Sequence, residues 1–481
     1  MSELYKLSLT EAAAKLKSRE ISVTELVSDC LARIEATEAE VRACLTVMAD
    51  QALGEAARLD AAGPDPAKAL WGVPLTLKDL FCTKGVRTTA ASRMLEKYVP
   101  PYDATVVTRL KESGAVMLAK TNLDEFAMGS STEFSAFGPS RNPWDSSKVP
   151  GGSSGGAAAS VASYQSPGAL GTDTGGSIRQ PAAFCGCVGL KPTYGRVSRY
   201  GIIAFASSLD QPGPMARRVA DCGALLEAMA GPDPKDNTAS LRPVDDYASA
   251  RPLNLKGLKL ACPRELWEVT TNQGVADVIQ QTRRKLEEAG AELRPVDIPN
   301  LKYSVAAYYI LGTAEASTNL ARFDGVRYGF RSENPRDLTE LYTASRSQSL
   351  GPEVKRRIIL GTFALSAGYY EAYYKKAARV RRLIRNDFNN LLNEFDFICS
   401  PVSSIPAWDF DAFIDDPLTA YQLDLMTLPV NLAGLPALSQ PVGRTPDGGL
   451  PVGFQLVGRA FEEKNLLSAG LALEEIFPPL L

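Results

Sequence analysis

Hydrophobic and polar positions near the start of the chain repeat with a helical period. Two Ser-x-x-Glu boxes, Ser8–Glu11 and Ser22–Glu25, match the capping box that opens many helices. They predict helices at about 9–18 and 23–37. The second has one apolar face, because the following residues recur at helical spacing: Leu26, Cys30, Leu31 and Ile34. The pattern indicates a helical cover at the N-terminus.

Further along, short apolar runs typical of strands alternate with helical runs. Strands are expected at 71–77, 115–119 and 168–171, and helices at 103–113 and 155–164. A connection rich in Pro, Asp and Ser follows at 231–254. Beyond it we expect strands at 257–261 and 291–296, a helix at 275–289, a mostly helical stretch at 304–394, and strands near 396–400, 437–442 and 452–457. The alternation predicts an α/β protein with helices layered on a sheet.

The amino-acid composition and the net charge exclude several classes of protein. Apolar residues make up 45% of the 481 positions and the net charge is -3, so nothing drives the whole chain toward nucleic acid or an anionic membrane. No run approaches the roughly 20 apolar residues of a membrane span, and the N-terminus MSELYKLSLTE lacks the apolar core of a secretion signal. The eight cysteines form no CxxC pair, which indicates reduced thiols in a cytoplasmic compartment and no metal site.

The chain contains no histidine. This excludes Ser-His-Asp and Cys-His catalysis, histidine general bases and histidine-ligated zinc. Gly151-x-Ser153-x-Gly155 fits the nucleophile elbow of α/β-hydrolases, but that motif requires a later histidine. Proton transfer is therefore left to Lys, Asp, Glu, Tyr, Ser or Cys.

Two glycine-rich turns between residues 150 and 181 each hold serine, at Gly151–Gly156 and Gly175–Ser177. Consecutive N–H groups in such turns can converge on an anion, as an oxyanion hole requires. The alternatives are a flexible linker and a tight turn without a ligand. The apolar, helix-forming run 157–162 and the charged Asp173 and Arg179 favour a site.

Lys78 directly follows the expected strand at 71–77, a poor place for a solvated lysine. Without histidine, a Ser-Lys pair is the remaining scheme for a serine nucleophile. Deprotonating an ordinary lysine at pH 7.5 costs about 4 kcal/mol, and burial lowers that cost. The alternative is a structural lysine paired with Asp79 or Asp173.

A basic run lies at 375–385. Its positive residues spread around several faces of the expected helix rather than along one stripe. We interpret it as a solvated helix or a protein interface rather than as a phosphate site.

Three stretches together resemble the amidase signature family: GVPLTLKD around Lys78, PGGSSGG around Ser153 and GTDTGGSIRQPAAFCG around Ser177. The spacings resemble that family too, with 75 residues from Lys78 to Ser153 and 24 from there to Ser177. The resemblance implies a Ser–cis-Ser–Lys triad in which Ser177 is the nucleophile, Ser153 the proton relay on a cis peptide after Gly152, and Lys78 the base. It also implies a central mixed β-sheet covered by helices on both faces, and an oxyanion hole made by backbone N–H groups of Thr174, Gly175, Gly176 and Ser177.

Within the family, the chain resembles the A subunits of tRNA-dependent amidotransferases along nearly its whole length. The stretches that carry this are 120–133, 191–214, 314–329, 353–376 and 424–439. The resemblance implies a cytoplasmic heterotrimer in which this chain, without a cofactor or metal of its own, hydrolyses glutamine. A B subunit with ATP and Mg receives the ammonia and handles most of the misacylated tRNA, and a C subunit holds A and B together. No contact with a membrane is expected.

The same resemblance implies a glutamine pocket. Arg357 would bind the α-carboxylate and Asp424 the α-ammonium, matching a guanidinium fork to a carboxylate, with Tyr308, Gly129 and Ser130 beside them. It further implies one amidase domain over 1–481, with a helical cover (1–60), a catalytic core (61–230) and a C-terminal part that completes the sheet and the pocket (255–481).

Three positions depart from related sequences. Phe134 stands where histidine is frequent, Ala157 replaces a frequent serine, and 401–404 departs from a usual Pro-Thr pattern. The 401–404 change bears on pocket shape or ammonia exit. Two other interpretations stay open: a stand-alone amidase acting on small amides, which would not require Arg357 and Asp424, and a scaffold subunit with a silent site.

Overall fold

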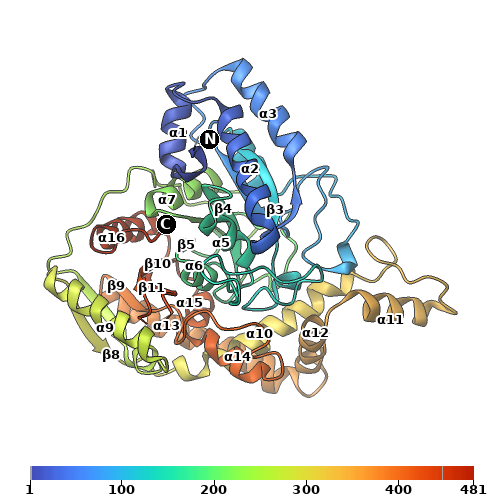
Figure 1. Cartoon of the computed structure of the whole chain (residues 1–481). Helices are drawn as coiled ribbons and strands as arrows, with labels where there is room; N and C mark the ends of the chain where they lie inside the picture. Colours follow the sequence, from blue (N-terminus) through green and yellow to red (C-terminus); the bar gives the residue numbers. More distant parts are fainter. Residues whose placement is uncertain (1–2, 447) are drawn as a thin grey trace.

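A computed structural model describes residues 3–446 and 448–481. One eleven-stranded sheet runs through it in the order β1-β3-β2-β4-β6-β5-β10-β11-β9-β7-β8 (Figure 1). The strands are β1 Cys44–Val47, β2 Pro74–Lys78, β3 Val116–Thr121, β4 Gly168–Asp173, β5 Val188–Lys191, β6 Gln211–Ala216, β7 Lys259–Pro263, β8 Glu292–Val296, β9 Phe397–Pro401, β10 Ala437–Arg444 and β11 Pro451–Val457. The sheet is mixed: β2 pairs in parallel with β3 and β4, whereas β4 pairs antiparallel with β6.

Helices flank the sheet. They are α1 Leu9–Lys17, α2 Val23–Val41, α3 Ala49–Ala62, α4 Thr105–Glu112, α5 Gly155–Ala162, α6 Arg179–Cys185, α7 Val219–Met229, α8 Arg264–Trp267, α9 Gln273–Glu288, α10 Ser304–Asn319, α11 Leu338–Ser349, α12 Pro352–Leu365, α13 Lys376–Glu394, α14 Pro417–Leu423, α15 Leu428–Ala433 and α16 Glu463–Ile476. Both capping boxes are present, at Ser8 with Glu11 and Ser22 with Glu25. The first helix agrees with its predicted range, and the second runs four residues further than expected.

Neighbouring residues of β2 show that helices cover both faces. The Thr76 hydroxyl lies 2.9 Å from that of Ser160 on α5. The preceding residue, Leu75, lies on the other face with Leu9 of α1 and Leu225 of α7, where all three surround Gly168. Successive side chains of a strand point to opposite faces, so α5 lies on one face and α1 and α7 on the other. This confirms the predicted α/β class.

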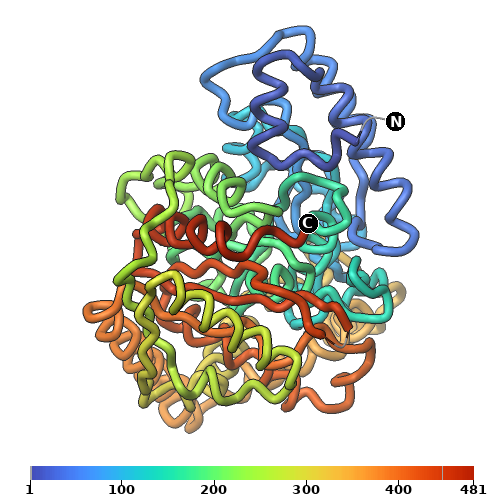
Figure 2. The backbone as a smooth tube through the Cα atoms, turned by 60° about the vertical axis from the view of Figure 1, so that its left-hand side comes forward, coloured from blue at the N-terminus to red at the C-terminus, as the bar shows by residue number. Residues whose placement is uncertain are grey.

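Strands come from each of the three segments expected from the sequence, and β1 falls inside the predicted helical cover. The boundaries of those segments stay a prediction. Figure 2 shows the C-terminal part (red) lying against the middle of the chain (green and teal), while the N-terminal helices (blue) stand at one end. The connection expected at 231–254 contains no helix or strand, and the helical stretch at 304–394 is present.

Three strands and several helices were not anticipated. β5 and β6 have the sequences VGLK and QPGPMA, in which Gly and Pro weaken any strand signal. They are stabilised by position instead, because β6 pairs with β4 and β5, and β5 with β10. β1 is a four-residue strand at the edge of the sheet, paired only with β3 within the described residues.

Candidate active site

Lys78 is the last residue of β2, and its side chain is fully buried. Its Nζ donates to three hydroxyls: Ser153 Oγ at 2.7 Å, Ser154 Oγ at 2.9 Å and Thr172 Oγ1 at 3.0 Å. Burial lowers the pKa of Lys78 to about 7, against the nearby carboxylates of Asp124, Asp173 and Asp210, which raise it. The site therefore offers a lysine that loses its proton near neutral pH.

The alternative pairing of Lys78 with Asp79 or Asp173 is wrong. Asp79 lies 3.1 Å from Lys120, and Asp173 lies 3.0 Å from Arg179. Both carboxylates are fully buried with these cations. Asp79 does not pair with Lys78 because consecutive residues of a strand project to opposite sides.

Ser153 follows a cis peptide bond after Gly152, as expected. Its neighbour connects it to the second glycine turn, because the Ser154 N–H donates to the Ser177 carbonyl at 3.2 Å. The Ser153 and Ser177 hydroxyls do not hydrogen-bond to each other among the described residues. Ser177 is 8% exposed, whereas Ser153 is fully buried. Of the two serines, Ser177 is the one that a substrate can reach.

The second glycine turn is fixed by Asp173. This carboxylate accepts from the Gly176 N–H at 2.8 Å and the Ile178 N–H at 3.2 Å. It is also held by Arg179 and Asn431. Burial alone would raise the pKa of Asp173, but Arg179, together with Lys191 and Asn431, outweighs it and lowers the pKa to about 2.

This anchoring changes the expected oxyanion hole. The Gly176 N–H is already engaged by Asp173. The N–H groups of Thr174, Gly175 and Ser177 make no hydrogen bond within the described parts of the chain. Three of the four expected donors therefore remain for a developing negative charge, and that assignment stays a prediction.

Tyr308 and Thr427 close over the turn. A Cβ at Gly175 would stand 2.6 Å from Tyr308 Oη, and one at Gly176, where φ is 132°, would stand 2.2 Å from Thr427 Oγ1. Thr427 donates to the Gly175 carbonyl at 2.6 Å. Only glycine fits such close approach, so the glycine pair is required by packing at this site.

Asp424, at the end of α14, accepts from Ser130 Oγ at 2.8 Å and from Tyr309 Oη at 2.9 Å. Burial raises the pKa of Asp424 to about 6, against both hydrogen bonds. Ser130 is joined to the first glycine turn through Gln180, which donates to the Ser130 carbonyl and accepts from the Gly152 N–H, each at 2.9 Å. Asp424 is thus connected to the serine turns. Sequence reasoning named Tyr308 and missed Tyr309.

Arg357 on α12 is 4% exposed. Its Nε donates to Glu353 Oε1 at 2.7 Å, and its guanidinium lies 5.4 to 5.6 Å from the rings of Tyr309, Tyr421 and Phe205. Sequence reasoning also missed Glu353, although its i,i+4 spacing to Arg357 is a readable signal.

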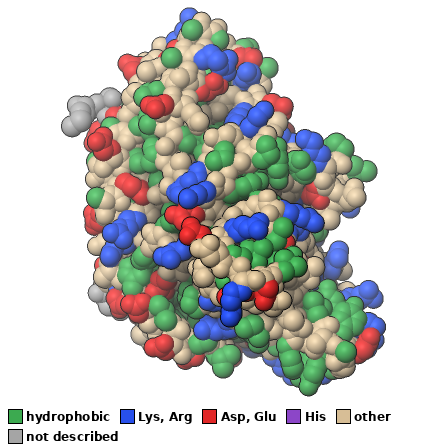
Figure 3. Space-filling model, turned by 90° about the vertical axis from the view of Figure 1, so that its right-hand side faces the viewer, with side chains coloured by type: hydrophobic (Ala, Val, Ile, Leu, Met, Phe, Trp, Pro, Cys, Tyr) green, Lys and Arg blue, Asp and Glu red, His purple; other side chains and the backbone are tan. Residues whose placement is uncertain are grey.

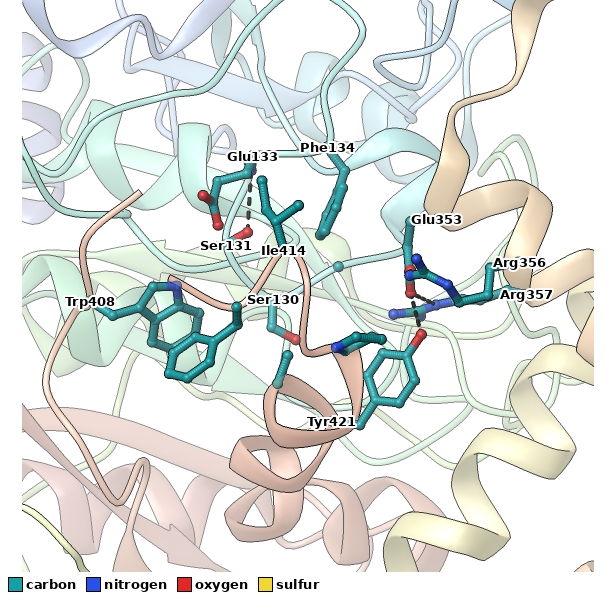
Figure 4. A pocket seen from close by; sticks show the side chains of 14 residues that line it. Ser130, Ser131, Glu133, Phe134, Glu353, Arg356, Arg357, Trp408, Ile414 and Tyr421 are labelled. Atoms are coloured by element: carbon teal, nitrogen blue, oxygen red, sulfur yellow. Dashed lines mark hydrogen bonds and ion pairs between the residues drawn. The ribbon is translucent and has the colours of Figure 1, made fainter. Parts of the chain in front are cut away.

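Arg357, Gly129 and Ser130 line one cavity of about 30 Å³, drawn in Figure 4. Lys78, Ser153, Ser177, Tyr308 and Asp424 lie outside its lining. Phe134 forms part of the wall, together with the segment that carries Phe413, Ile414 and Pro417.

The other two departures lie away from the cavity. Ala157 is buried inside α5. Val402 packs in a cluster with Trp408, which itself lines the cavity. Residues 401–404 therefore reach the pocket only through a neighbour.

Some residues of the basic run at 375–385 hold the fold together and others are exposed to solvent. Arg381 donates to the Leu432 carbonyl at 3.0 Å, which joins α13 to α15, and to the Ser208 carbonyl before β6 at 2.8 Å. Arg382 and Arg385 are exposed. Figure 3 shows Lys and Arg side chains interspersed with Asp and Glu over one face of the molecule.

Within residues 3–446 and 448–481, no cluster of three or more Cys, Asp or Glu side chains is arranged to hold a metal ion. In the same ranges, no helix combines the length and apolar character that crossing a membrane requires.

Comparison with known proteins places this geometry in context. A family model described as Amidase matches residues 25–467. The A subunit of the glutamyl-tRNA(Gln) amidotransferase of Oleidesulfovibrio alaskensis is 55% identical over 477 residues, covering 99% of this chain and 98% of that one. The crystal structure of the A subunit of the same name from Thermotoga maritima is similar with a TM-score of 0.83 and 43% identity, over 99% of this chain and 96% of the other. A peptide amidase from Stenotrophomonas maltophilia also has a TM-score of 0.83, at 32% identity over 98% of both chains.

Proposed function

The chain belongs to the amidase signature family, and from this premise we propose that it is the glutaminase subunit of a tRNA-dependent amidotransferase. The observation that carries the proposal is the placement of Arg357 and Asp424. These opposite charges lie on one connected network with the two serine turns. A free amino acid carries both an α-carboxylate and an α-ammonium, so a site with both complements selects it over a simple amide.

In this proposal Ser177 Oγ attacks the side-chain carboxamide carbon of glutamine. Ser153 accepts the Ser177 proton as it gives its own to neutral Lys78, whose Nζ lies 2.7 Å from the Ser153 Oγ. The N–H groups of Thr174, Gly175 and Ser177 stabilise the oxyanion. The relay then protonates the departing amine, which leaves as ammonia, and water hydrolyses the glutamyl ester of Ser177.

Arg357 binds the α-carboxylate and Asp424 the α-ammonium, with Ser130 and Tyr309 holding Asp424. Tyr308 and Gly129 complete the walls on either side. The raised pKa of Asp424, about 6, still leaves the carboxylate ionised at neutral pH. The ammonia passes to a B subunit that uses ATP and Mg to activate misacylated tRNA, and a C subunit completes a cytoplasmic heterotrimer. The two similar A subunits, from Oleidesulfovibrio alaskensis and Thermotoga maritima, support this arrangement.

Replacing Ser177 with Ala tests the proposal. The complex that co-purifies with the full chain is assayed for amidation of misacylated tRNA, fed either by glutamine or by ammonium. We expect glutamine-driven amidation and glutamate release to be lost and ammonium-driven amidation to be kept. Ser28→Ala, an exposed serine on α2, is the control. Retained glutamine-driven amidation in Ser177→Ala would refute the assignment.

The similarity to a peptide amidase favours one second candidate, a stand-alone amidase. That function predicts turnover of simple amides by the isolated chain, at a rate that Arg357→Met and Asp424→Asn leave unchanged. A silent scaffold subunit would form no acyl-enzyme with an electrophilic glutamine analogue. Formation of that adduct on Ser177, detected by intact mass, contradicts the scaffold interpretation.

A further inference from the structure

Glu353 lies in the first turn of α12, one turn before Arg357, and is 3% exposed. Its Oε1 accepts from Arg357 Nε at 2.7 Å and from Tyr421 Oη at 2.6 Å. Its other oxygen pairs with Arg356. Burial alone would raise the pKa of Glu353, but Arg357, Tyr421 and Arg356 together outweigh it and hold the pKa below its usual range. A buried, ionised glutamate therefore stands directly behind the proposed carboxylate-binding arginine.

The contact to Glu353 determines which edge of the guanidinium is free. A guanidinium has five N–H donors in a rigid plane. Glu353 takes the Nε–H, and the Nη groups of Arg357 make no hydrogen bond within the described residues. Three aromatic rings stand within 5.6 Å of its central carbon, which restricts rotation of the plane. The Nη edge is thus left for an anion.

Tyr421 joins the two halves of the pocket. Its hydroxyl bonds to Glu353, and its ring stacks on that of Tyr309 with centroids 4.0 Å apart and an interplanar angle of 24°. The Tyr309 hydroxyl in turn donates to Asp424 at 2.9 Å. Figure 4 shows the Tyr421 hydroxyl directed at Glu353 beside Arg357. One continuous path therefore runs from the arginine to the aspartate.

We propose that Glu353, supported by Tyr421, is a positioning residue that orients the Nη edge of Arg357 toward the substrate α-carboxylate and so determines specificity for an α-amino acid amide. This rests on the proposed function, because it assumes that Arg357 meets an α-carboxylate. Glu353 itself does not touch the reacting atoms. Its charge also neutralises a buried arginine, which otherwise would carry a large desolvation cost.

Two truncated amides separate this role from a merely structural one. Glutaramate keeps the carboxylate of glutamine and lacks the ammonium, whereas 4-aminobutanamide keeps the ammonium and lacks the carboxylate. We expect Glu353→Gln to lower kcat/KM about tenfold for glutamine and for glutaramate, since it replaces a charge-assisted hydrogen bond with a neutral one of roughly half the strength. The value for 4-aminobutanamide should stay unchanged.

The measurement uses the full chain with its co-purifying subunits and follows ammonia release. Glu340→Gln is the matched control, because Glu340 pairs with Arg336 at the same i,i+4 spacing, at 2.8 Å, but with the arginine 86% exposed. It should affect none of the three substrates. Tyr421→Phe keeps the stacked ring and removes only the hydroxyl; we expect a loss of about threefold to tenfold with the same substrate pattern.

Equal losses for all three amides in both variants would overturn the proposal, since they would indicate general damage to the site. If the Glu353→Gln chain does not fold, Tyr421→Phe provides the test. An unchanged ratio of kcat/KM for glutamine to kcat/KM for 4-aminobutanamide in that variant also overturns the proposal. Failure of the wild-type complex to release ammonia from glutamine is a different result. It would refute the proposed function itself rather than the role of Glu353 within it.

Discussion

Raising the pH through 7 should switch on glutamine hydrolysis, because Lys78 must lose a proton before it can accept one from Ser153. Burial lowers the pKa of Lys78 from 10.5 to about 7. At about 1.4 kcal/mol per pH unit, the shift corresponds to about 5 kcal/mol in favour of the neutral amine. About one-tenth of the sites are then active at pH 6 and about nine-tenths at pH 8, so kcat/KM rises about tenfold between them.

The assay measures kcat/KM for glutaramate between pH 5.5 and 9.5. This substrate lacks the ammonium, so ionisation of Asp424 does not enter the binding step. Burial also brings the pKa values of Glu125 and Lys191 to about 7, so an inflection near 7 that persists in Glu125→Gln and in Lys191→Met belongs to Lys78. Thermal denaturation at each pH verifies that the chain stays folded.

Two results would refute this reasoning. A rate that climbs tenfold per unit beyond pH 9 would mean that Lys78 keeps an ordinary pKa. A rate that is flat from pH 6 to 8 would mean that Lys78 is not the base. Lys78→Arg stays protonated throughout this range and should be inactive at every pH.

Three further predictions concern the surroundings of the triad. Gly175→Ala places a methyl group 2.6 Å from Tyr308 Oη. We expect the unfolding free energy to fall by about 1–3 kcal/mol and most of the activity to be lost. Turnover at the wild-type rate would contradict the packing argument. For the wild type, KM for glutamine should rise as the pH falls through about 6, because protonation of Asp424 removes the partner of the substrate ammonium. The Asp424→Asn variant should show a high KM that does not depend on pH in this range. Arg179→Met leaves Asp173 buried and uncompensated, so urea unfolding should show a loss of about 3–5 kcal/mol, and a loss below about 1 kcal/mol would show that other donors satisfy the carboxylate.

The parts of the fold that were predictable are those with a strong local signal. Both N-terminal helices begin at their capping boxes, and apolar runs such as those at 115–119 and 452–457 became β3 and β11. β6, with the sequence QPGPMA, carries no such signal and forms because β4 and β5 supply its partners. Strand order likewise depends on pairings between segments far apart in the chain, such as β5 with β10.

In the candidate site, too, some features could be predicted from the sequence and others could not. The zero histidine count, Lys78 at the end of an apolar strand, and the two glycine–serine turns indicated serine–lysine chemistry without any coordinates. The ion-pair partner of each nearby carboxylate could not be predicted from the sequence. Asp79 lies next to Lys78 in the chain and yet pairs with Lys120. Nor did the sequence indicate that Asp173 occupies the Gly176 N–H.

Residue types and short motifs were enough to indicate the chemical class of this protein, because the backbone requirements of those motifs are local. The tertiary structure alone decided the environment of each group. Ser130 meets Asp424 from 294 residues away, and Tyr309 rather than Tyr308 donates to that carboxylate. Glu353 meets Tyr421 across 68 residues. Burial, which lowers the pKa of Lys78, is likewise a property of the packed chain, because desolvation depends on every segment that excludes water from a group.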